Sequence, residues 1–281
     1  MMGLSQVQLC YGSKTCDLSD MTRIISIANQ KGGVGKTTTA INLGAALAIR
    51  GKRVLLIDLD PQGNASTGLG VSRQTRRKST YDLILSDANA ADIAVKTDVE
   101  NLSIIPATMD LSSADTELMV SPRRVVHLRN ALRLRSLPFD YVLIDCPPSL
   151  NLLTINAFVA ADTILVPLQA EFFALEGLSQ LLVTVREVRD TANSELRLEG
   201  VVLTMFDRRN NLCQQVEADV REHLGDLVLQ TKIPRNVRLS EAPSYAMPVL
   251  NYDPTSKGAI AYRSLAAELL QRAEEKVASH V

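Results

Sequence analysis

A glycine-rich segment, QKGGVGKTT over residues 30–38, places the strongest constraint on how this 281-residue chain can fold. It follows the apolar run Ile24–Ala28 and leads into the helical pattern Thr37–Arg50, so it joins a buried strand to a helix. At such a junction the first N–H groups of the helix and the helix dipole both favour an anion. Glycines let the backbone curl closely around phosphate oxygens. The segment therefore predicts a phosphate-binding loop, because a glycine-rich turn that binds nothing would not require all these features together.

The residue types in this loop match what a nucleotide phosphate and its metal ion need. Lys36 is expected to reach the β- and γ-phosphates, and the Thr37 hydroxyl to bind Mg²⁺. The standard pattern has glycine at position 30, where this chain has Gln30, and the chain adds a second lysine, Lys31. Two ammonium groups at one phosphate would be crowded, so one option is that Lys31 contacts nucleotide held by a second subunit. The predicted nucleotide-binding residues of the loop are Gly32, Gly33, Val34, Gly35, Lys36, Thr37 and Thr38.

Short apolar runs alternate with amphipathic stretches along the rest of the chain. The expected strands are Ile24–Ala28, Arg53–Asp58, Leu102–Ile105, Tyr141–Asp145, Thr163–Pro167, Gly200–Met205 and Val228–Ile233. The expected helices are Thr37–Arg50, Arg123–Arg135, Gly177–Ala192, Leu212–Leu224 and Gly258–Lys276. Strands without apolar–polar alternation are buried on both faces, which indicates a mostly parallel, twisted sheet with helices on both sides. We predict a single α/β domain of the P-loop NTPase class over residues 22–276, followed by a short tail, 277–281.

Composition and charge exclude several other classes of protein. Hydrophobic residues make up 46% and charged residues 22%, which is typical of a globular domain. The net charge of −1 argues against a protein that is basic all over but permits a local basic patch. The chain lacks a run of about 18 apolar residues, so no transmembrane helix is expected, and the cytoplasm is the predicted compartment.

Three minor features carry expectations of their own. The polar residues 1–21 are expected to be a disordered leader, or to reflect a translation start placed too early, because they lack the apolar core of a secretory signal. The segment Gly68–Ser79, with its basic run at 76–78, is expected to be a surface loop. The four cysteines form no CxxC pair, so Cys146 and Cys213 are predicted to be buried apolar residues.

Two carboxylates follow predicted strands close to the phosphate loop. Asp145 ends the apolar run Val142–Asp145, where it would bind Mg²⁺ directly or through water. The alternative is an aspartate that caps the following turn. Asp60 lies two residues beyond Asp58, the last residue of the second strand. An isolated carboxylate at such a place is more often a turn residue than a catalytic one.

The segments KGGVGKTT (31–38) and DLDPQGN (58–64) together resemble the deviant Walker A ATPases, and among these the ParA/Soj chromosome- and plasmid-partitioning ATPases. The likeness runs from about residue 22 to about residue 273. It also includes YVLIDCPPSL (141–150), EFFALEG (171–177) and IPRNVRLSEAPS (233–244).

The resemblance implies slow, Mg²⁺-dependent hydrolysis of ATP to ADP and phosphate by an ATP-sandwich homodimer. It implies that Lys31 acts across the dimer interface and that Asp60 orients or deprotonates the attacking water. Asp58 would support the metal from its second coordination shell. The residues expected to contact the base are Met205, Pro234 and Asn236.

The resemblance also implies that the dimer binds double-stranded DNA without sequence preference, lies on the nucleoid, and has a ParB-type centromere-binding partner. The predicted DNA-binding residues are Arg208, Arg209, Arg235 and Arg238, from the segments MFDRRNN and IPRNVRLS. Neither segment has a helical spacing that would commit these arginines to intrachain ion pairs. The alternatives are that they are ordinary solvated arginines, or that one of them pairs with Glu241.

Three other functions are compatible with the phosphate loop alone. A MinD-like, membrane-cycling ATPase of cell-division positioning requires a basic amphipathic C-terminal helix. Residues 265–276 carry more acids than such an anchor would, so we expect this helix to pack on the core and expect no membrane partner. An iron–sulfur carrier or nitrogenase iron protein requires interface cysteines, and Cys146 has none at a suitable spacing. A nucleotide-gated scaffold that never hydrolyses ATP would not need Lys31 and Asp60.

Overall fold

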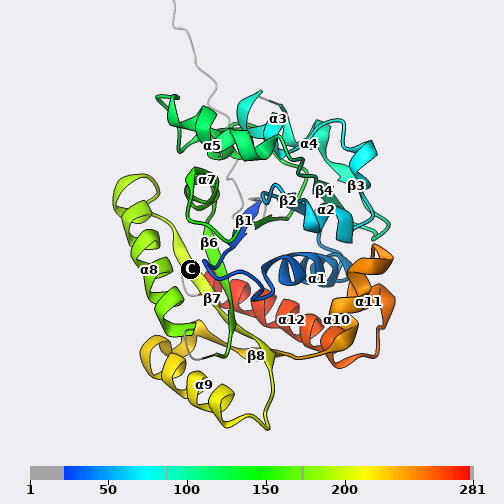
Figure 1. Cartoon of the computed structure of the whole chain (residues 1–281), viewed down its shortest axis with the longest axis vertical. Helices are drawn as coiled ribbons and strands as arrows, with labels where there is room; N and C mark the ends of the chain where they lie inside the picture. Colours follow the sequence, from blue (N-terminus) through cyan, green and yellow to red (C-terminus); the bar gives the residue numbers. More distant parts are fainter. Residues whose placement is uncertain (1–21, 87, 172–173, 279–281) are drawn as a thin grey trace, which may run out of the picture.

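One eight-stranded sheet organises the described part of the chain, which in this computed structural model comprises residues 22–86, 88–171 and 174–278 (Figure 1). The strand order is β3-β4-β2-β5-β1-β6-β7-β8. Neighbouring strands are parallel except at one edge, where β3 runs antiparallel to β4. The strands are β1 (Arg23–Ile27), β2 (Val54–Asp58), β3 (Val95–Lys96), β4 (Leu102–Ile105), β5 (Tyr141–Asp145), β6 (Thr163–Gln169), β7 (Arg197–Phe206) and β8 (Val228–Pro234).

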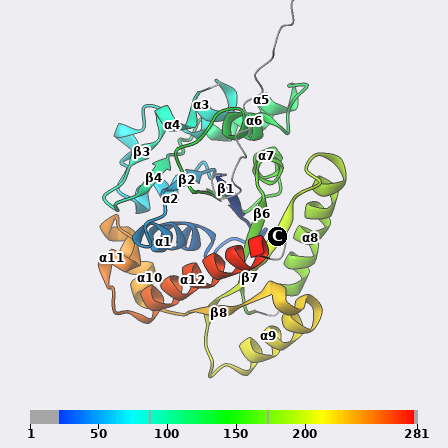
Figure 2. The same ribbon diagram turned by 180° about the vertical axis from the view of Figure 1, so that it is seen from behind.

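Helices cover both faces of the sheet, as the unbroken apolar strands predict (Figures 1 and 2). The face that carries the first helix holds α1 (Lys36–Ile49), α2 (Asn64–Gly68), α10 (Val237–Glu241), α11 (Val249–Tyr252) and α12 (Lys257–Ala278). The opposite face holds α3 (Thr80–Leu85), α4 (Ala90–Ile93), α5 (Leu111–Met119), α6 (His127–Arg133), α7 (Leu152–Ala160), α8 (Ala174–Thr191) and α9 (Asn211–Leu224). Short 3₁₀ turns lie at Arg73–Thr75, Gly225–Leu227 and Ala242–Tyr245.

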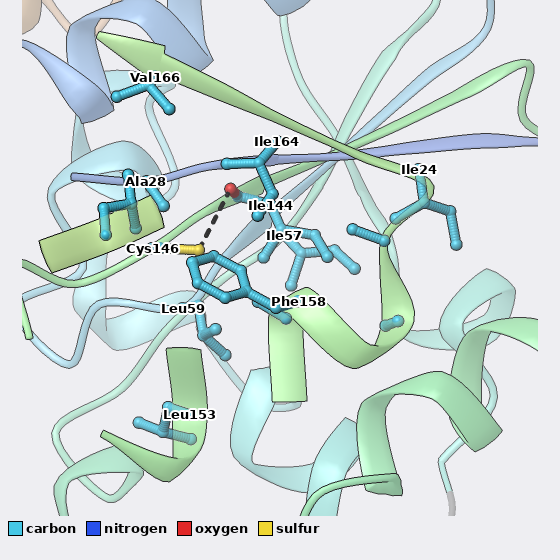
Figure 3. Packing of buried hydrophobic residues seen from close by; sticks show 14 of the residues in the cluster. Ile24, Ala28, Ile57, Leu59, Ile144, Cys146, Leu153, Phe158, Ile164 and Val166 are labelled. Atoms are coloured by element: carbon cyan, nitrogen blue, oxygen red, sulfur yellow. Dashed lines mark hydrogen bonds between the residues drawn. The ribbon is translucent and has the colours of Figure 1, made fainter. Parts of the chain in front are cut away.

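Alternate residues of the central strands contribute to two separate hydrophobic cores. Ile25 of β1 packs with Leu47 of α1 and Leu265 of α12 on one face. Its neighbour Ile24 packs with Phe158 of α7 on the other face (Figure 3). All three of the side chains Ile24, Ile25 and Phe158 are fully buried. The sheet therefore lies between two layers of helices. The carboxyl ends of its central strands are shielded from solvent on both faces.

Cys146 belongs to this second core, which confirms its predicted role as a small buried apolar residue. The side chain is 1% exposed, and its thiol makes a long contact of 3.8 Å to the carbonyl of Ile144 (Figure 3). Burial raises the pKa of the Cys146 thiol far above its ordinary value, so it stays protonated. Cys213 is buried as well.

Helix α12 packs against α1 and β8 through residues such as Tyr262 and Leu265, which confirms the expected docking of the C-terminal helix. No helix within the described ranges is long and apolar enough to cross a membrane. The predicted leader, residues 1–21, lies outside the described residues.

The structure contains short helices that the sequence did not predict, and it corrects one predicted loop. The pattern did not reveal α3, α5 and α7, because helices of six to nine residues are too short to display a helical repeat. The segment Gly68–Ser79 is only partly the predicted surface loop. It contains a 3₁₀ turn, and Arg76 within it is half-buried in a network of hydrogen bonds.

Candidate active site

The phosphate loop connects β1 to α1 in a conformation that its glycines make possible. Gly35 caps the helix with φ of 89°, in the left-handed region where a side chain would be strained. The first helical hydrogen bond runs from the Thr39 N–H to the Gly35 carbonyl at 2.8 Å. The Thr204 hydroxyl on β7 donates to the Val34 carbonyl at 2.8 Å, so the loop is held against β7, two strands away from β1 in the sheet. The N-terminus of α1 is thereby held open toward a phosphate group.

Lys36 is a buried cation at the start of α1. Its side chain is 7% exposed, and Nζ donates to the Lys31 carbonyl at 2.9 Å. Burial lowers the pKa of Lys36, while the negative charges of Asp145 and Asp60 act to raise it. A lysine stripped of water in this way interacts more strongly with a phosphate than an exposed one would.

Asp58 and Asp145 lie opposite each other at the carboxyl ends of β2 and β5, and both are fully buried. Asp58 accepts hydrogen bonds from the Ser66 N–H at 2.8 Å and from the Ser66 hydroxyl at 2.6 Å. Burial raises the pKa of Asp58 to about 6, although the bonds from Ser66 act to lower it. Burial and the charge of Asp58 raise the pKa of Asp145 well above its ordinary value.

The Asp145 carboxylate is the group that fits a metal ion. Neither of its oxygens accepts a hydrogen bond of ordinary geometry from a described residue, although the nearby Thr37 hydroxyl acts to lower its pKa. A buried charge without a partner is costly, and a cation would satisfy it. No group of three or more His, Cys, Asp or Glu residues gathers in the described ranges to form a complete metal cage. Mg²⁺ typically takes one or two protein oxygens and completes its shell with phosphates and water, so Asp145 and Thr37 suit it.

Replacing Asp145 by asparagine should therefore stabilise the nucleotide-free protein and abolish its response to Mg²⁺·ATP. The raised pKa means that the folded state binds more protons than the unfolded state, so stability falls as the pH rises above the ordinary carboxyl pKa. The variant lacks this loss, and we expect its free energy of unfolding at neutral pH to be about 1–3 kcal/mol higher. Thermal unfolding with and without Mg²⁺·ATP measures both effects. Equal stabilisation of both proteins by Mg²⁺·ATP would contradict the metal assignment.

Asp60 lies in a tight turn directly after β2 and is partly exposed. Its carboxylate accepts a hydrogen bond from the Gln62 N–H at 2.9 Å, and its carbonyl accepts one from the Gly63 N–H at 2.9 Å. The charge of Asp60 acts on both Lys36 and Asp145. The fold thus brings together the lysine and the three carboxylates that the sequence singled out.

The three residues expected to contact the base line one cavity of about 240 Å³ next to the loop. Gly35, Thr38 and Thr204 line the same cavity as Met205, Pro234 and Asn236. Met205 has φ of 50°, a strained conformation for a residue with a side chain, and lies where the pairing of β7 with β8 shifts register. The Asn236 side chain caps α10 by accepting from the Arg238 N–H.

The predicted DNA-binding arginines do not all lie in one place. Arg208, Arg209 and Arg235 line an open groove of about 780 Å³. Arg238 instead pairs with Glu241 at 2.8 Å and with Asp253 at 3.3 Å. The expectation that no local spacing commits these arginines is therefore wrong for Arg238, because the short helix α10 places Glu241 three residues along.

Arg209 is also paired, with Asp207 at 3.0 Å, but its side chain remains 91% exposed. Two lysines of the same groove were missed from the sequence, Lys232 on β8 and Lys257 at the start of α12. Lys232 lies over the Phe206 ring, 4.7 Å from its centre. No motif marks either lysine. The pairing of β8 with β7 brings Lys232 to the arginines, and the packing of α12 beside β8 brings Lys257 there.

The second lysine of the loop has an intrachain partner. Lys31 Nζ lies 2.6 Å from a carboxylate oxygen of Glu171, and both side chains are about half-exposed. The Gln169 amide holds the other oxygen of that carboxylate. Of the segment EFFALEG, residues 172–173 lie outside the described residues.

The chain is similar to named proteins over most of its length. A family model described as "AAA domain" matches residues 22–198. The chain is 57% identical over 258 residues to the "Chromosome partitioning protein ParA" of Caulobacter vibrioides, covering 91% of this chain and 97% of that protein. It is 54% identical over 249 residues to the "Sporulation initiation inhibitor protein Soj" of Bacillus subtilis, covering 89% and 98%.

A solved structure of similar fold contains the ligands that the site predicts. Cobyrinic acid a,c-diamide synthase from Mycobacterium smegmatis, with bound ADP and magnesium, superposes with a TM-score of 0.79 at 39% identity. The superposition covers 90% of this chain and 96% of that protein. These similarities, together with the phosphate loop and the buried Asp145 carboxylate beside it, show that the chain belongs to the ParA/Soj family of partitioning ATPases and hydrolyses ATP with Mg²⁺.

Proposed function

We propose that ATP closes two copies of this chain into a sandwich dimer, that the dimer binds DNA without sequence preference, and that hydrolysis releases it. The observation that carries this proposal is that the base cavity and the basic groove share two lining residues. Pro234 and Arg235 line both the base cavity and the basic groove. A nucleotide in the cavity would therefore contact the same residues that form the edge of the groove.

The groove has the charge that DNA phosphates require. Its lining contains five cations and one carboxylate, and these residues are Arg208, Arg209, Lys232, Arg235, Lys257 and Asp207. The protein as a whole carries a net charge of −1, so attraction to DNA has to come from local basic surface such as this groove. A dimer would present two such grooves, and binding that depends on phosphate neutralisation strengthens steeply with the number of contacts.

Within each site the residues take separate parts in hydrolysis. Lys36 and the N–H groups of the loop bind and orient the β- and γ-phosphates. Mg²⁺ held by Asp145 and Thr37 would neutralise the charge that develops on them. Asp60 orients or deprotonates the attacking water, while Asp58 stays hydrogen-bonded to Ser66 beside the metal site. Lys31 reaches the nucleotide of the partner subunit.

The relative from Caulobacter vibrioides favours partitioning over the membrane-cycling alternative, since it is a chromosome partitioning protein by name. The packing of α12 against the core leaves its apolar residues Leu265 and Leu269 buried and unavailable to a bilayer. We infer a ParB-type centromere-binding partner that stimulates hydrolysis, and a nucleoid location that follows from DNA binding.

The deciding experiment measures DNA binding with ATP, with ADP and without nucleotide across a series of salt concentrations. We expect binding only with ATP, and a steep loss of affinity with salt. Equal binding in all three states would contradict gating by the dimer. Flotation with anionic liposomes and ATP tests the membrane alternative on the same preparation.

Charge reversal in the groove should weaken DNA binding without affecting the dimer. In Arg209→Glu each subunit loses one phosphate contact, so the slope of log affinity against log salt should fall by about two per dimer. Arg186→Glu, at an exposed site on α8 outside the groove, is the matched control with the same change in net charge. Wild-type affinity of Arg209→Glu at low salt would remove Arg209 from the interface.

A further inference from the structure

Arg76 lies outside the recognised motifs, yet its guanidinium contacts the end of the loop that carries Asp60. Nη1 donates to the Ala107 carbonyl at 2.8 Å. Nη2 donates to the Thr67 hydroxyl at 2.8 Å and contacts the Gly63 carbonyl at 3.3 Å. Nε and Nη2 both donate to the Val71 carbonyl, at 3.2 and 3.0 Å. One side chain thus joins the start of α2, the turn that follows it and the segment after β4.

Gly63 shows how closely the guanidinium approaches the backbone. A Cβ atom at position 63 would lie 2.3 Å from Arg76 Nη1 and 3.2 Å from the Ala107 carbonyl oxygen. Gly63 also has φ of 65°, which a side chain would strain. The glycine therefore leaves room for the arginine at the point where the Asp60 turn becomes helix α2.

A second set of bonds holds the same loop from its other end. The Ser66 hydroxyl donates to Asp58 at 2.6 Å and accepts from the Ala107 N–H at 3.1 Å. The N–H of Ala107 is thus bound through Ser66 and its carbonyl through Arg76. The six-residue span from Asp58 to Gly63, which contains Asp60, is therefore linked at both ends to one residue, Ala107.

We infer that Arg76 is a positioning residue for ATP hydrolysis, which acts by holding the turn that carries Asp60. This inference rests on the role proposed for Asp60. Arginine suits the task because its planar fork offers five donors in fixed directions, whereas lysine has one compact donor group. An error of about 1 Å in placing a catalytic group can lower the rate about 10²-fold.

The test compares Arg76→Ala, Arg76→Lys and the matched control Arg77→Ala, whose arginine is exposed at the neighbouring position. Intrinsic ATP hydrolysis is followed at varied ATP concentration with Mg²⁺. We expect Arg76→Ala to lower kcat about 10²-fold with KM for ATP nearly unchanged, because the phosphate loop and base cavity are untouched. Arg76→Lys should stay low as well, since it restores charge without the fork.

A structural role alone would lower thermal stability but leave kcat per folded molecule at the wild-type value. That result, or full rescue by Arg76→Lys, would overturn the inference. Should Arg76→Ala not fold, Arg76→Lys alone decides, because it retains the charge and most of the side-chain volume. Asp60→Ala separates the two proposals. Normal turnover in Asp60→Ala removes the role of Asp60 itself, whereas a stalled Asp60→Ala beside a normal Arg76→Ala refutes only the positioning role.

Discussion

Replacing Asp60 by alanine is expected to leave ATP binding intact and to stall the protein as an ATP-bound dimer on DNA. The carboxylate lies next to Lys36 and Asp145 but takes no part in the fold of the phosphate loop. Loss of a positioned base or water-orienting group lowers the rate by about 10²- to 10⁴-fold. Phosphate release at saturating ATP, together with DNA retention after removal of free ATP, measures the effect.

Two further variants sharpen this test. Asp60→Asn keeps an acceptor oxygen for the Gln62 N–H and so preserves the turn. It should retain part of the activity if Asp60 only orients water, and should stall if Asp60 takes a proton. Glu100→Ala, which removes an exposed carboxylate far along the chain, is the control and should behave as wild type. Normal turnover in Asp60→Ala would exclude Asp60 from the mechanism.

Lys31→Ala should retain some ATP binding and lose the ATP-dependent dimer. Lys36 and the loop N–H groups remain in place to bind phosphate within one subunit, whereas the proposed charge from the second subunit disappears. A cation supplied in this way to the phosphoryl group is worth about 10³-fold or more in rate. Light scattering with ATP measures the dimer, and phosphate release measures the turnover.

The contact between Lys31 and Glu171 supplies the comparison for this prediction. Glu171→Gln removes the charge that holds Lys31 at 2.6 Å but leaves the lysine itself, so ATP should still form the dimer. Lys96→Ala, at an exposed position on β3, removes the same charge elsewhere and should also dimerise. A normal ATP-dependent dimer of Lys31→Ala would refute the role across the interface.

Buried strands and the longer helices were predictable because their signals are local. Ile24–Ala28 is apolar except for Ser26, Val142–Ile144 is apolar throughout, and β1 and β5 form where expected. The antiparallel edge strand β3 was not predicted, since it has two exposed residues and no pattern of its own. The short helices α3, α5 and α7 were not predicted either, because their stability comes from packing against the sheet rather than from an amphipathic repeat.

Charged residues show more clearly the difference between what a local pattern predicts and what only tertiary packing decides. The stretch MFDRRNN predicted exposed arginines, and Arg209 is exposed. No local pattern reports that Arg238 meets Asp253, or that Arg76 reaches Ala107, because these pairs form only after distant segments pack together. The basic run at 76–78 looked like a solvated loop, yet its first arginine is an internal hydrogen-bond donor.

By itself, the sequence determined the strand–loop–helix unit around Lys36 and the place of Asp145 at a strand end. Hydrogen bonds and glycine conformations between near neighbours suffice to specify both. Only the tertiary structure decided that Asp145 is buried beside Asp58 with no ordinary hydrogen bond from a described residue, and that Lys232 and Lys257 join the arginine groove. These outcomes depend on contacts between segments far apart in the chain, whose burial and geometry no local pattern encodes.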